Sequence, residues 1–193
     1  MADNLSIKDS GGTNRTLATA ESGGVHTPKH VIVDGEAFIG AVGGPCDLIT
    51  ITPTVNTGGA HASGDVLFDA TAIAGSVRAA GQKAVLQSVT IHDKAANTQE
   101  IDLLFFRTTH ALGTPNSAPS INDADSLDII AIVNVPSSAF KNIGPGTLAT
   151  ITDQHPLLKL SSGTTMYVAA ITRGTPTFGS TSDLVLDIGF VWN

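Results

Sequence analysis

The alternation of apolar and polar residues changes near residue 46, where a segment rich in glycine and polar residues gives way to repeated short apolar runs. The clearest run is Leu184–Trp192, in which every second residue is a large apolar one. A period of two is typical of a strand with one face on a core. Similar runs, bounded by proline, glycine or polar turns, predict further strands at residues 47–54, 65–68, 127–135, 147–152, 157–160 and 165–172.

The stretch 84–108 predicts a β-hairpin on which the rest of the chain is organised. Its first strand has apolar residues on one side: Val85, Val89 and Ile91. Residues 93–100 hold no large apolar side chain and predict the turn. The second strand has apolar residues on one side as well: Ile101, Leu103 and Phe105. Leu104 and Phe106 lie on its other side, and a strand apolar on both faces is usually central in its sheet, or covered by a second layer or a partner chain. Leu104 and Phe106 are therefore candidate subunit contacts.

Many short strands without a long helical period predict an all-β protein. We expect residues 46–193 to form a jelly-roll-like antiparallel β-sandwich domain. An immunoglobulin-like sandwich is the alternative, weakened because there is no cysteine pair and the single tryptophan is residue 192. The alanine-rich residues 70–80 could instead form a helical turn, although Thr71, Gly75 and Val77 disfavour it.

Residues 1–45 differ from the rest, with many small polar residues and three Gly-Gly pairs. Such a segment cannot bury enough apolar surface to fold alone. Because it still contains apolar runs, we expect an extended N-terminal arm that becomes ordered against a neighbour. The residues that we expect to form the interaction arm are Arg15, Val25, His26, Pro28, His30, Val31, Ile32 and Val33.

The charge balance limits the partners of the protein. The formal net charge is -7, and charged residues make up only 14% of the chain. An acidic surface repels nucleic-acid phosphates and anionic membranes, so we expect neither as a partner. The beginning of the chain lacks a basic stretch followed by an apolar run, and no segment approaches the roughly 20 apolar residues of a membrane span. We therefore expect synthesis in the cytoplasm, without a secretory signal.

Cysteine and histidine residues give little support for a metal centre. The single cysteine, Cys46, excludes an internal disulfide and is expected to be a small buried residue. His26 and His30 have the spacing of a metal pair on a helix, but Pro28 disfavours that helix and predicts an extended kink. Asp123, Asp125 and Asp128 alternate as calcium ligands do, without the glycine and glutamate of an EF-hand. They are a weak calcium candidate, and Asx turns explain the same residues.

The motifs of common enzyme classes are absent from the sequence. It contains no G-x-S-x-G, H-E-x-x-H, Walker or G-x-G-x-x-G motif. We therefore expect neither catalytic residues nor a cofactor. A carbohydrate-binding sandwich is a further alternative, but one tryptophan and one tyrosine offer few rings for stacking on sugars.

The N-terminal segment contains two distinctive motifs, Asp-Ser-Gly-Gly-Thr-Asn-Arg-Thr-Leu at residues 9–17 and Gly-Val-His-Thr-Pro-Lys-His at residues 24–30. Both resemble motifs of small virion structural proteins of tailed bacteriophages. The same group is similar at residues 84–106, at residues 120–125 and at residues 165–190. The resemblance implies a virion component and brings no catalytic residues with it.

From the resemblance and the composition we expect a capsid decoration protein on the outer surface of the virion. Its partners would be the major capsid protein and copies of itself, in a homotrimer. The alternative is a tail, baseplate or fibre component that binds other tail proteins or host surface glycans.

Overall fold

The computed structural model describes residues 46–152 and 155–192 in full, together with the backbone of four short strands nearer the N-terminus. The chain divides into two compact units, residues 1–41 and residues 42–193, and each is described by itself. No helix in the part of the chain described is long and apolar enough to cross a membrane.

The four N-terminal strands form two local hairpins. Strand β1 (Leu5–Lys8) pairs antiparallel with β2 (Asn14–Leu17), and β3 (Thr19–Ser22) pairs antiparallel with β4 (Val25–Pro28). In the sequence, Gly11-Gly12 lies between β1 and β2, and Gly23-Gly24 lies between β3 and β4. The extended N-terminal arm that we expect for residues 1–45 stays a prediction.

The structure describes only some of the residues that we predict to form the interaction arm. Arg15 lies in β2, and β4 contains Val25, His26 and Pro28. The remaining predicted contacts lie outside the described residues: His30, Val31, Ile32 and Val33. The extended backbone expected at Pro28 is confirmed by its place in a strand. The contacts of the arm with a partner stay a prediction.

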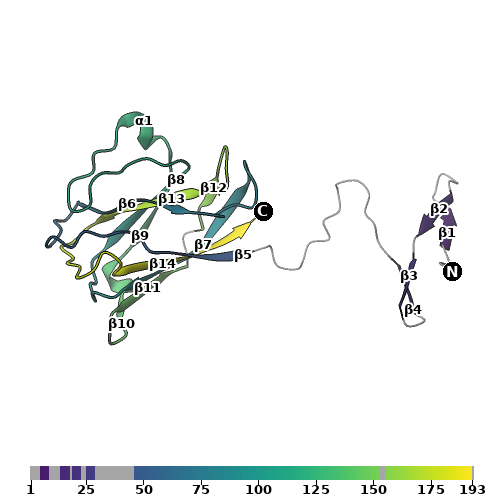
Figure 1. Ribbon diagram of the computed structural model, residues 1–193, viewed down its shortest axis with the longest axis horizontal. Coiled ribbons are helices and arrows are strands. Elements are labelled where there is room, and N and C mark those ends of the chain that lie inside the picture. The colour runs from purple at the N-terminus through teal and green to yellow at the C-terminus, as the bar shows by residue number, and fades with distance from the viewer. Residues whose placement is uncertain are drawn as a thin grey trace. The chain divides into compact units, whose positions relative to one another are not determined.

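Residues 46–192 form two antiparallel sheets (Figure 1). The larger sheet has the order β10 (Lys141–Asn142), β11 (Thr147–Ile151), β7 (Lys83–Asp93), β14 (Leu184–Trp192) and β5 (Cys46–Ile51), and β12 (Leu157–Lys159) also pairs with β7. The smaller sheet has the order β6 (Val66–Ile73), β13 (Met166–Thr172), β8 (Ile101–Phe106) and β9 (Ile129–Val135). The only helical segments among the fully described residues are the short α1 (Asp123–Ser126) and η1 (Ser137–Ala139). The prediction of an all-β sandwich is confirmed.

The main core lies between the two sheets. It contains residues from the inner face of the larger sheet and from the inner face of the smaller one, among them Leu86, Ile91, Leu186, Ile188, Phe190, Leu103, Phe105, Val133 and Val168. The predicted alternation of the last strand is confirmed, because Leu184, Leu186, Ile188 and Phe190 are all buried. Each such side chain contributes about 1.5–3 kcal/mol when it leaves water.

The prediction of a hairpin over residues 84–108 is wrong. Strands β7 and β8 both form, but β7 belongs to the larger sheet and β8 to the smaller, so the connection between them crosses from one sheet to the other. A register shift beside Gly189 also interrupts the alternation of β7. Ala84 and Leu86 consequently join the core with Val89, whereas Val85 does not.

Two smaller expectations are also corrected. Strand β6 continues to Ile73, so the alternative of a helical turn at residues 70–80 is wrong over its first part, and turns and bends follow. Cys46 is exposed rather than buried, because it begins β5 at the edge of the larger sheet.

Candidate functional site

The loop of residues 107–128 covers the outer face of the smaller sheet. A second apolar cluster, separate from the main core, forms beneath it from Val66, Leu104, Phe106, Leu112 and Ala169. The exposed fraction is 5% for Leu104 and 0% for Phe106. The chain's own loop therefore covers these two side chains, which corrects the expectation that a second subunit does.

A helical turn near the end of this loop is held by its N-cap residue. The side-chain oxygen of Asn122 accepts a hydrogen bond from the backbone N–H of Asp125 at 2.9 Å. The Asn122 amide donates to the Asp125 carboxylate at 2.7 Å. Asparagine is a favoured N-cap because it satisfies an otherwise free N–H group in the first turn. This cap orients Asp125 toward the rest of the loop.

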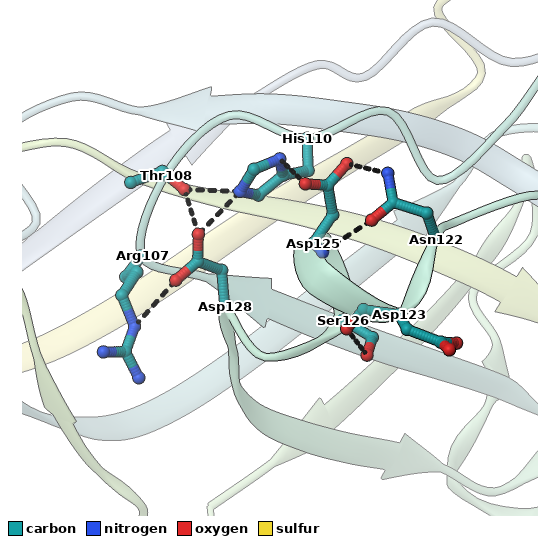
Figure 2. A network of polar contacts seen from close by, with 8 residues as sticks. All are labelled: Arg107, Thr108, His110, Asn122, Asp123, Asp125, Ser126 and Asp128. Atoms are coloured by element: carbon teal, nitrogen blue, oxygen red, sulfur yellow. Dashed lines mark hydrogen bonds and ion pairs between the residues drawn. The ribbon is translucent and has the colours of Figure 1, made fainter.

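His110 lies between two carboxylates of the same loop (Figure 2). Its Nε2 atom is 2.6 Å from Oδ2 of Asp128, and its Nδ1 atom is 3.2 Å from Oδ1 of Asp125. The Thr108 hydroxyl lies 2.7 Å from His110 Nε2 and donates to Asp128 Oδ2, also at 2.7 Å. Both ring nitrogens face carboxylates, so a protonated imidazole can donate to each of them.

The Asp128 carboxylate contacts the basic and hydrogen-bond donor groups of the network. Arg107 Nε forms an ion pair with Asp128 Oδ1 at 3.3 Å. The hydrogen bond from His110, followed by that from Thr108 and the charge of Arg107, lowers the pKa of the Asp128 carboxyl below 3.8. Hydrogen bonds and nearby positive charge favour the ionised form of an acid, which explains the direction.

The network does not bring the calcium candidates Asp123, Asp125 and Asp128 together. Asp125 and Asp128 bind His110 from its two sides, and the carboxylate of Asp123 points away from both (Figure 2). Among the residues that the structure describes, no group of three or more His, Cys, Asp or Glu side chains is placed to hold a metal ion. The three aspartates act here as partners of His110 and as residues of the helical turn.

The arrangement fastens the loop across the outer apolar cluster. His110 joins the beginning of the loop to Asp128, which comes directly before β9. In the middle of the loop, the backbone N–H of Leu112 donates to Asp69 Oδ1 at 2.7 Å. Asn116 and Ser117 form backbone hydrogen bonds with Val66 of β6. These contacts fix the loop at several points.

A cavity that the sequence did not reveal opens on the outer face of the larger sheet. Its volume is about 420 Å³, and it is lined mostly by apolar surface near the connection between β10 and β11. The lining includes Ile143, Pro145 and Val185. His92 and Asp187 also line it, with His92 Nε2 3.1 Å from Asp187 Oδ2. Its size is within the range of small-molecule sites.

The polar groups of this cavity are ordered differently from a nucleophilic triad. Thr50 Oγ1 donates to Asp187 Oδ1 at 2.5 Å, so Asp187 lies between Thr50 and His92. In a triad the histidine lies between the hydroxyl and the acid, because it must take the proton of the nucleophile. His92 has no such contact with Thr50, and the arrangement does not activate the hydroxyl. No signal in the sequence joins these residues, which come from three strands of the larger sheet.

Comparison with protein-family models, with curated proteins and with solved structures found no match to this chain.

Proposed function

We propose that the protein is a bacteriophage virion structural protein, and that it serves as a capsid decoration protein on the outer surface of the shell. It would bind the major capsid protein and other copies of itself. The virion motifs in the N-terminal segment, at residues 9–17 and 24–30, motivate this assignment.

The observation that carries the proposal is the order of the strands, which supports a jelly roll. Counting β5, β6, β7, β8, β9, β11, β13 and β14 as strands one to eight, the first pairs with the last, the second with the seventh, the third with the sixth and the fourth with the fifth. These nested pairs are what results when one long hairpin is rolled into two sheets. Jelly rolls are common in viral capsid proteins, so the order favours a virion role.

The charge of the chain also supports an outer position. A net charge of -7 would be repelled by a packaged genome, whereas a protein on the outside of the shell meets no such repulsion. The contact with the shell would then depend on apolar burial and backbone pairing, as in other stable assemblies.

The N-terminal segment, residues 1–45, is the part that we propose reaches the shell. It holds apolar runs at residues 31–33 and 38–39 in an otherwise polar sequence. The expected homotrimer depended on Leu104 and Phe106, which the chain's own loop covers. Self-association therefore needs a different surface.

A tail, baseplate or fibre component is the second candidate. Jelly rolls also occur in lectin domains, so the same strand order is compatible with binding of host surface glycans. The two candidates differ in copy number, because decoration proteins cover the whole shell and tail components are present in far fewer copies.

Binding to shells tests the proposal. The full chain should saturate isolated shells that lack it, and a variant without residues 1–45 should keep the circular dichroism of a β-sandwich but no longer bind. If the shortened variant saturates shells as the full chain does, the role of the N-terminal segment is wrong. If the full chain binds isolated tails and not shells, the decoration role is wrong.

A further inference from the structure

Strand β9 forms a free edge of the smaller sheet. It pairs with β8 on one side, and its other side has no backbone hydrogen bond to any residue in the described part of the chain. Its sequence, IIAIVNV, contains no charged residue and no proline, and a register shift against β8 interrupts it only at Ile130. Charges and proline usually protect a long edge, because unpaired N–H and C=O groups can pair with another strand. The regular part of the edge, from Ala131 to Val135, has neither protection.

Exposed apolar side chains gather at the same edge. Five large apolar residues are exposed among those described, and three of them lie on or beside β9. Leu127 comes two residues before the strand and is 78% exposed, Ile132 is on the strand and 59% exposed, and Leu157 on β12 is 57% exposed. Single exposed apolar residues are normal on a protein surface, whereas several together usually mark an interaction surface.

A groove runs between β9 and β12 on this side of the sandwich. Its volume is about 680 Å³, and its lining combines four apolar residues with two basic ones: Ile129, Ile130, Leu157 and Leu160, and Arg107 and Lys159. Ala131 is part of the same strand and packs on the main core, yet it is only partly buried. The edge is therefore accessible to a further strand, which would close the groove from the side.

The other edges of the two sheets are protected. The edge of β6 is hydrogen-bonded by the loop at Asn116 and Ser117. Strand β10 is only two residues long and begins with Lys141. Strand β5 contains the exposed Asp47. Within residues 46–192, β9 is the long edge without a charge.

We propose that β9 pairs antiparallel with β9 of a second copy about a two-fold axis, so that two four-stranded sheets become one continuous sheet. The sequence of the strand is suited to meeting itself. Pairing centred on Ile132, in the regular part of the strand after the register shift, puts Ile132 opposite Ile132 of the other copy. Ala131 then faces Val133 of the other copy. Cross-strand pairs of β-branched apolar residues stabilise an antiparallel sheet, and no like charges are opposed.

The charge of the chain favours this surface over others for self-association. Two copies with a net charge of -7 repel each other over most approaches. The neutral β9 edge lets them meet without placing acids face to face. A two-fold interface is also the commonest symmetry of soluble oligomers, since one self-complementary surface serves both copies. The inference concerns the free protein and does not depend on its place in a virion.

Substitution of Ile132 by lysine tests the pairing in solution. The full chain should have twice the 19.7 kDa mass of one copy when measured by sedimentation or light scattering. Ile132→Lys places two positive charges together on the axis and should return the mass to that of one copy. Ile143→Lys is the matched control, because Ile143 is a similarly exposed isoleucine, at 55% exposure, in the connection between β10 and β11. It should leave the dimer intact. Circular dichroism and thermal melting of both variants establish that they are folded.

A cysteine at the axis tests the geometry independently of stability. In the Cys46→Ser background, Ile132→Cys should form a disulfide-linked dimer on mild oxidation, because residues opposed in an antiparallel pair have Cα atoms about 4.5–5.5 Å apart. Ile143→Cys in the same background should not cross-link with comparable yield.

Three results would overturn the proposal. One is a wild-type chain that remains a single copy at the highest soluble concentration. Another is a dimer or trimer that survives Ile132→Lys. The third is a dimer in which Ile132→Cys does not cross-link. Loss of shell binding by Ile132→Lys in a wild-type protein that is monomeric would show instead that β9 pairs with a different protein.

Discussion

His110 Nε2 lies 2.6 Å from Asp128 Oδ2, and this contact joins the beginning of the loop after β8 to the residue before β9. The loop spans the apolar residues on the outer face of the smaller sheet, which would otherwise meet water. A polar contact between loop residues thus helps to keep that face closed.

Replacement of His110 by phenylalanine should loosen the loop. The substitution keeps an aromatic ring but leaves Asp125 and Asp128 without their common partner. Amide exchange at Leu112 and Ser120, whose N–H groups are hydrogen-bonded inside the structure, should become several-fold faster. His92→Phe is the control, because it removes the histidine that pairs with Asp187 on the other sheet. Unchanged exchange in His110→Phe would mean that the remaining contacts hold the loop without it.

Phe106 should contribute to stability as a core residue does. It is fully buried under the loop, and Phe106→Ala is expected to lower the free energy of unfolding by about 3–5 kcal/mol. Ile143→Ala changes an exposed side chain and should alter it by no more than about 0.5 kcal/mol. Urea unfolding of the two variants measures the difference. A small effect of Phe106→Ala would contradict a closed outer face and would restore the idea that a partner covers it.

The Asp128 carboxylate should stabilise the fold fully only at pH values above the range in which an aspartate ordinarily ionises. Its pKa is lowered in the folded state by the hydrogen bond from His110, so its contribution is present above 3.8 and is lost as the pH falls through the folded-state value. The difference in unfolding free energy between wild type and Asp128→Asn should therefore be largest near neutral pH and shrink in acid. Asp123→Asn, which changes a carboxylate outside the network, should show no such dependence. A constant difference for Asp128→Asn across the same series would contradict the ionic role.

Asp93 should change the pH dependence of stability in the opposite direction to Asp128. Burial raises the pKa of its carboxyl, although hydrogen bonds from Asn97 and Ala95 oppose the shift. The stabilisation that comes from the protonated Asp93 carboxyl is fully present below pH 3.8. It is lost as the pH rises through the higher pKa of the folded state. Asp93→Asn should therefore become more stable relative to wild type as the pH rises through that range. Urea unfolding over the acid range measures this, and a fall in relative stability with rising pH would disprove the assigned cause.

The individual strands could be predicted from the sequence because each has its own apolar alternation. The last strand is the clearest case, with four buried residues at every second position from Leu184 to Phe190. The partners of the strands could not be predicted in the same way. The polar segment after β7 is compatible with a hairpin turn and with a crossing between sheets, and only the packing of both sheets decides between them. Local alternation cannot reveal a register shift such as the one beside Gly189.

The candidate sites depended even more on contacts across the sequence. The aspartates at residues 123, 125 and 128 were visible as a group in the sequence. His110, which contacts Asp125 and Asp128, lies 15 residues before the first of these two and 18 before the second, so the sequence did not connect it with them. The sequence showed that Leu104 and Phe106 must be covered, and could not show that the covering residues, such as Leu112, come from the following loop. His92, Thr50 and Asp187 meet only because β7, β5 and β14 share one sheet.

The location and copy number of the protein on intact particles test the proposed function most directly. If the proposal is right, virions of the encoding phage can be purified, labelled with antibody and quantified by mass spectrometry against the major capsid protein, which gives both values. A decoration protein should label the shell uniformly and be present at a copy number of the same order as the major capsid protein. Label confined to the tail, or absence from the particle, would contradict the proposal.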